Sequence, residues 1–255
     1  MKSPMLMFAL VASILLMSYH PVSAYTIADN YIGKGNPYDG GYDQYDVIGD
    51  STIFGIDKMT VNTSGNSMSV AIFTNYVNHI GDSGTGLGDL FISTNGWHPY
   101  GSAPYLNDNY QNGEHWEYAL AMNANGSVSL FKVAANNSNI KLTDSFIDHN
   151  RYYFRAGQEA RIDTTQTNYL VSNSVGSWAI NGGAKTLTYT FDLSNFDPSK
   201  DFSSSTWGFH WDMTCGNDVI EGAAPAPVPE PSTFVLLAAG LLGAVFYRRR
   251  LHKRS

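Results

Sequence analysis

Carboxylates are the first side chains in this sequence whose types and spacing could support chemistry. Two carboxylates that face one cleft can hydrolyse a glycosidic bond, one as the acid and the other as nucleophile or base. Glu114 and Glu117 are three positions apart, and on a strand that spacing sends two side chains to opposite faces. The pattern therefore disfavours catalysis by this pair, and a secreted polysaccharide hydrolase or lyase stays an alternative function.

Four aspartates in a glycine-rich stretch could hold a cation, because calcium prefers several oxygen ligands. They are Asp39, Asp43, Asp46 and Asp50. The stretch does not match the EF-hand loop, and a solvated acidic loop is the simpler interpretation. Calcium is the only cofactor that the sequence indicates, and a calcium-dependent adhesin is a second alternative function.

Aromatic residues gather in a segment rich in Gly, Pro and Asn, which is typical of loops. They are Trp97, Tyr100, Tyr105 and Tyr110. Rigid amphipathic rings stack on the apolar faces of sugars with little loss of entropy. We expect this group to contact a glycan, whereas rings that fold down over the edge of a β domain are the alternative.

The single cysteine excludes a disulfide framework and a Cys-rich zinc site. In an oxidising compartment a lone thiol either lies in the core or pairs between molecules. We expect Cys215 to be buried.

Charge is divided unevenly along the chain. Residues 25–228 hold 21 acidic and nine basic residues, whereas six of the 15 Lys and Arg residues lie in the terminal segments. A middle region with this excess of acidic residues repels phosphate backbones. We therefore exclude nucleic acid as a partner. Neutral glycans and cations are compatible with it.

The middle of the chain must position these groups, and its apolar residues recur with the period of two that marks β-strands. The clearest strands are expected at 116–122, 187–193 and 207–213, each with one buried face. Turn residues such as Asn125-Gly126 and Ser64-Gly65-Asn66 separate neighbouring strands. About ten strands and no long amphipathic helix predict one all-β domain over residues 25–222, an antiparallel β-sandwich that is jelly-roll-like.

The first 24 residues are typical of a secretory signal peptide. Lys2 precedes an apolar run from Met5 to Met17, and small residues at Val22-Ser23-Ala24 suit a signal peptidase. We expect the mature chain to start at Tyr25.

The last 33 residues, 223–255, have three parts. A Pro-rich spacer leads to Val228, Pro229, Glu230 and Pro231; an apolar segment follows at 233–247, and then Arg248, Arg249 and Arg250. A helix of that length spans roughly 22 Å, short of the ~30 Å hydrocarbon core, and arginines that reach toward the headgroups can bridge the gap. The arginines predict that the tail stays cytoplasmic as a membrane stop.

This tail resembles the PEP-CTERM sorting signal of bacterial surface proteins that an exosortase processes. The resemblance implies export across the inner membrane of a Gram-negative bacterium, transient anchoring there, and cleavage near Pro229-Glu230-Pro231. It also implies delivery to the cell surface or to the exopolysaccharide of the extracellular matrix. A single-span anchor that is never cleaved is the alternative. Together these features predict a non-enzymatic surface or matrix protein with a structural or adhesive role, associated with exopolysaccharide.

Overall fold

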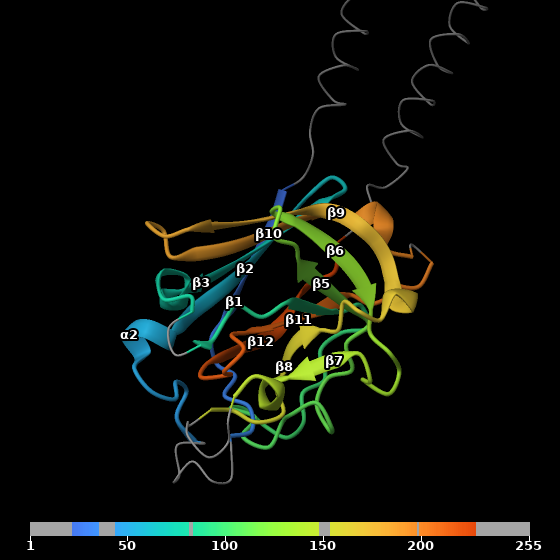
Figure 1. Ribbon diagram of the computed structural model, residues 1–255. Coiled ribbons are helices and arrows are strands. Elements are labelled where there is room, and N and C mark those ends of the chain that lie inside the picture. The colour runs from blue at the N-terminus through green and yellow to red at the C-terminus, as the bar shows by residue number, and fades with distance from the viewer. Residues whose placement is uncertain (1–21, 36–43, 82–83, 148–153, 198, 228–255) are drawn as a thin grey trace, which may run out of the picture. The chain divides into compact units, whose positions relative to one another are not determined.

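The computed structural model describes residues 22–35, 44–81, 84–147, 154–197 and 199–227 (Figure 1). Residues 1–21 of the predicted signal peptide lie outside this part of the chain. So do the predicted sorting motif, membrane segment and arginine cluster. Within the described ranges, no helix has the length and apolar character needed to cross a membrane.

The described chain is almost entirely strands and loops, and its helices are single turns. The strands are β1 (Val22–Ala28), β2 (Ile56–Ser64), β3 (Ser67–Thr74), β4 (Leu90–Ser93), β5 (Tyr118–Met122), β6 (Ser127–Lys132), β7 (Ile140–Leu142), β8 (Glu159–Ile162), β9 (Leu170–Asn181), β10 (Thr186–Asp192), β11 (Thr206–Asp212) and β12 (Val219–Pro225). The short helices are α2 (Ser51–Phe54), η2 (Asn75–Asn78), η4 (Thr143–Ser145), η5 (Thr167–Tyr169) and η6 (Leu193–Asn195). The predicted all-β class is confirmed.

Ten strands form one sheet in the order β1-β2-β3-β10-β9-β6-β5-β4-β11-β12, and β7 pairs with β8 in a small second sheet. The pairings from β2 through β12 are antiparallel, as expected. The sheet curls so that its edge strands β1 and β12 approach each other (Figure 1). At the closest point a Cβ on Gly222 would lie 2.6 Å from Cγ2 of Ile27, so glycine lets the edges meet. The two separate sheets of a jelly roll are thus replaced by one nearly closed sheet.

The main hydrophobic core fills the inside of this curl. Met59, Val70 and Leu187 come from the β2, β3 and β10 side, and Leu120 and Phe209 come from the β5 and β11 side; all five are fully buried. The turns follow the sequence: Gly65 and Gly126 adopt φ of 56° and 84° in the predicted hairpins, a region that glycine enters without steric cost.

The prediction that each strand buries one face is wrong for β11. Its residues from Trp207 to Asp212 are all buried, because a second apolar cluster covers the other face of this part of the sheet. That cluster contains Phe91, Trp116, Phe131 and Ile162. His210 lies on this covered face, with its ring 5.5 Å from Trp116 and 5.9 Å from Phe91.

The strands at the two ends of the sheet extend slightly beyond residues 25 and 222, and the expected domain boundaries stay predictions. β12 runs to Pro225, three residues past the boundary expected at 222. A proline fits there because an edge strand leaves one row of its backbone groups unpaired within the sheet. β1 begins at Val22, three residues before the expected start of the mature chain. Cys215 is buried, as predicted, and burial raises the pKa of its thiol to about 12.

Candidate functional site

A groove of about 720 Å³ lies where the two edges of the sheet approach each other. One wall is β1 with the residues that follow it, up to Tyr31, and the opposite wall is Glu221, Gly222 and Ala223 of β12. The loop residues Trp97 and Ala103 to Tyr105 complete the lining. The groove therefore exists because the sheet does not close into a full barrel.

Four aromatic residues line this groove, Tyr25, Tyr31, Trp97 and Tyr105, and Tyr105 contacts two of the others. The rings of Trp97 and Tyr105 meet edge to face with centroids 5.4 Å apart, and Tyr105 stacks on Tyr31 at 5.7 Å. Tyr105 has a φ of 63°, a left-handed conformation that is unfavourable for a side chain of this size and that concentrates at functional sites. The loop thus holds an aromatic surface in place at the cost of local backbone strain.

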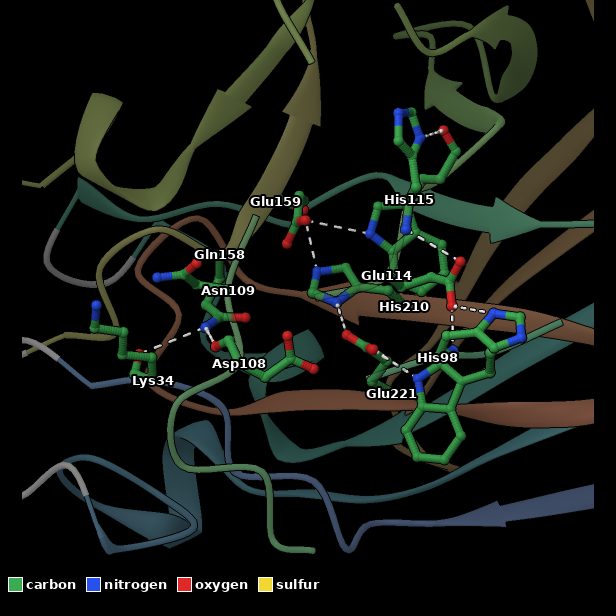
Figure 2. Close-up of polar contacts among 12 residues, drawn as sticks. Lys34, His98, Asp108, Asn109, Glu114, His115, Gln158, Glu159, His210 and Glu221 are labelled. Atoms are coloured by element: carbon green, nitrogen blue, oxygen red, sulfur yellow. Dashed lines mark hydrogen bonds and ion pairs between the residues drawn. The ribbon is translucent and has the colours of Figure 1, made fainter. Parts of the chain in front are cut away.

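Glu221 of β12 places a carboxyl group in the same groove. Its Oε1 accepts a hydrogen bond of 2.6 Å from Nε1 of Trp97, and its Oε2 lies 3.0 Å from Nδ1 of His210. Figure 2 shows His210 between Glu221 and Glu159. Nε2 of His210 is 3.2 Å from the main-chain oxygen of Glu159. The ring of Trp97, which lines the groove, is thereby hydrogen-bonded to a chain of buried polar groups.

The protonation of this chain follows from its geometry. A carbonyl oxygen only accepts hydrogen bonds, so Nε2 of His210 carries a hydrogen. Nδ1 then accepts a hydrogen bond from the carboxyl group of Glu221, which keeps its own proton. Burial raises the pKa of Glu221 to about 8. It also raises the pKa of Glu159, whose Oε1 accepts from Nε1 of Trp116 at 3.3 Å, to about 8.

Glu114 holds the aromatic loop against the sheet. Its carboxylate accepts hydrogen bonds from Oγ of Ser93 at 3.1 Å, from the backbone of His115 at 3.0 Å and from the backbone of His98. Glu117 accepts instead from the backbone N–H of Thr94 at 2.8 Å. Glu114 and Glu117 therefore hold neighbouring loops in place, and neither is among the residues that line the groove.

The structure brings together two of the four predicted glycan-contact residues. Trp97 and Tyr105 line the groove. Tyr100 is 52% exposed and is not part of the lining. Tyr110 is half-buried, next to Gly157.

The four predicted calcium ligands do not form a group among the described residues. Asp39 and Asp43 lie outside the described part of the chain. Asp50 is the N-cap residue that precedes α2, and its Oδ1 accepts from the backbone and the hydroxyl of Thr52 at 2.8 and 2.7 Å. Asp46 lies instead near Asp29 and Asp218.

Sequence reasoning missed four residues of the site: Tyr31, Glu159, His210 and Glu221. Glu221 carries the strongest local signal, since it follows Val219-Ile220 and precedes glycine and alanine, a setting in which a charged side chain must find a partner. That signal does not identify the partner, because Trp97 is 124 positions away.

Comparison with known proteins identifies the C-terminal tail. Residues 227–250 match the family model of the PEP-CTERM protein-sorting motif. The matched range contains both the Pro229-Glu230-Pro231 signature and the three arginines, so the predicted resemblance is confirmed. No curated protein and no solved structure matches the chain.

Proposed function

We propose that this chain, an exosortase-dependent PEP-CTERM protein, binds polysaccharide at the cell surface or in the extracellular matrix and does so without catalysis. The sorting motif implies export, membrane-associated sorting and processing by an exosortase. The groove between β1 and β12, where Tyr25, Trp97 and Tyr105 are partly exposed and Tyr31 lies buried behind them, is the observation that carries the binding part of the proposal.

The groove suits a sugar chain for two reasons. Aromatic rings pack against the C–H faces of pyranose rings and give large contact area at low entropic cost. The buried carboxyl group of Glu221 accepts from Nε1 of Trp97 at 2.6 Å and so fixes that ring in position at the groove. Apolar walls with a few fixed polar groups are typical of small-ligand sites.

Binding is better supported than hydrolysis by the carboxylates of the groove. Glycosidases use two carboxyl groups that flank the scissile bond. Among the described residues, Glu221 is the acidic side chain that lines the groove. We therefore keep a hydrolase or lyase as the alternative, to be tested by sugar release.

The charge of the domain narrows the glycan class. Residues 25–228 carry 12 more acidic than basic residues, and a strongly negative surface repels polyanions. We expect neutral or amino-substituted polysaccharides to bind, and uronate polymers to bind weakly.

Substitutions in the groove test this function. With the full-length chain in detergent micelles on a polysaccharide array, we expect Trp97→Ala and Tyr105→Gly each to weaken binding at least tenfold. Glycine at 105 removes the ring without adding strain, since φ is positive there. Tyr100→Ala is the matched control and should bind as the wild type does. Wild-type binding to no polysaccharide, or unchanged binding by both groove variants, would refute the proposal, and release of reducing sugar would favour the hydrolase.

A further inference from the structure

Three aspartates from distant parts of the chain converge outside the groove. Asp29 directly follows β1, Asp46 lies in the loop before α2, and Asp218 directly precedes β12. One carboxylate oxygen from each lies within 4.8 Å of the other two. The loops are fixed there, because Asn217 and Ile48 exchange hydrogen bonds of 2.6 and 2.7 Å.

Asp29 supplies an independent sign that something is bound. Both of its carboxylate oxygens are buried and have no hydrogen-bond partner. Charged oxygens removed from water without a partner are strongly destabilising. Three ionised carboxylates this close together repel one another unless a cation lies between them.

The nearby arginine does not satisfy Asp29. The guanidinium of Arg155 is fully buried and donates to the main-chain oxygens of Gly33, Tyr45 and Asp46. With all three aspartates ionised, as metal ligands must be, three carboxylates and one guanidinium sum to two negative charges. A single divalent cation would neutralise them.

We propose that Asp29, Asp46 and Asp218 form a calcium-binding site that joins the ends of β1 and β12. Oxygens bound to one calcium ion at 2.3–2.6 Å can be at most about 5 Å apart, which accommodates the 4.8 Å limit found for this cluster. An all-oxygen ligand set selects hard cations. Magnesium, with bonds of about 2.1 Å, would need a tighter and more regular cage.

The position of Asp46 allows an ion to enter and leave. Asp46 is exposed, whereas Asp218 is fully buried, with its oxygens accepting from the backbone of Ile56 and Val219 at 2.6 and 2.9 Å. Each of those oxygens keeps a lone pair for a metal. The ion would therefore sit between an ordered inner ligand and a solvent-facing outer one.

Thermal unfolding of the full-length chain in detergent micelles tests the site. We expect 1 mM calcium chloride to raise the Tm by about 5 °C or more over EDTA if the Kd is near 10 μM. Asp29→Asn should abolish this shift. In EDTA the same variant should unfold at or above the wild-type Tm, because it removes repulsion between the carboxylates of the cluster. Asp57→Asn makes the same change in charge on a side chain that is 76% exposed, and it should keep the shift.

Terbium luminescence sensitised by the protein's aromatic residues measures binding directly. Wild type should bind terbium and release it to calcium, and Asp46→Asn, altered at the exposed ligand, should bind at least tenfold more weakly. An identical wild-type Tm in calcium and EDTA, or a full calcium shift in both Asp29→Asn and Asp46→Asn, would overturn the site. An equal shift with magnesium would overturn the assignment to calcium. None of these readouts involves a glycan, so they are independent of the proposed function.

Discussion

The curled sheet has two halves that differ in how many faces they bury. In β3 and β10, buried and more exposed residues alternate for most of the strand, so one face is covered. Their neighbour β9 buries only Val175. In β4, β5 and β11 nearly every residue is buried. We call these the one-sided and the two-sided half. The polar chain of His210, Glu221 and Glu159 belongs to the two-sided half, where a polar side chain on the outer face must be paired within the protein.

Among the variants that test the difference between the two halves, substitution of His210 is expected to change the free energy of unfolding most. His210→Ala leaves the carboxyl group of Glu221 and the main-chain oxygen of Glu159 short of a partner. We expect a loss of about 3–5 kcal/mol in the free energy of unfolding, measured by urea denaturation. Thr190→Ala, on the exposed face of β10, should change it by less than about 0.5 kcal/mol. Equal losses from the two variants would abolish the distinction between the halves.

The second effect is the contribution of two buried glutamates of the two-sided half to the dependence of stability on pH. The folded protein keeps Glu159 and Glu221 protonated up to a pKa of about 8, whereas the ordinary value is 4.5. Their stabilisation is therefore complete below about pH 4.5 and is lost as the pH rises to about 8. Each group contributes a slope of up to about 1.4 kcal/mol per pH unit. Glu159→Gln should flatten the stability profile in this window.

A carboxylate of the one-sided half provides the control. Hydrogen bonds from Ser194 lower the pKa of Asp192, so its stabilisation is present above the ordinary value of 3.8 and is lost at more acid pH. Asp192→Asn should leave the slope between pH 4.5 and 8 unchanged. A profile that rises with pH in that window would contradict the protonation assigned to the two glutamates.

The smallest change in the free energy of unfolding is expected for a substitution on β9. Ile180 is 38% exposed on the one-sided half, and surface substitutions of this kind usually change stability by no more than about 0.5 kcal/mol. Ile180→Thr should therefore keep the wild-type midpoint of urea denaturation within that limit. A loss above about 1.5 kcal/mol would mean that another surface covers β9.

Predictability from sequence does not follow the same division. Alternation located β10 of the one-sided half and β5 and β11 of the two-sided half closely, because large apolar residues recur with a period of two in all three. β12 was not predicted, since Glu221, Gly222 and Ala223 break that period. Trp97 and Tyr105 were identified by residue type alone, whereas Tyr31 and Glu221 join them only through the meeting of two sheet edges, which local sequence does not encode. The aspartate cluster was missed for the same reason, and only Asp46 was among the expected ligands.

The pairing of β11 with β4 has a consequence for the order in which the protein matures. Their paired residues are more than 110 positions apart, as with His210 and Phe91, and contacts this distant form slowly. During synthesis the apolar residues of β4 and β5 therefore emerge well before β11 and β12 arrive to cover them. Folding can finish only after the last strand has been made, so the half-made domain is the stage most in need of protection from aggregation.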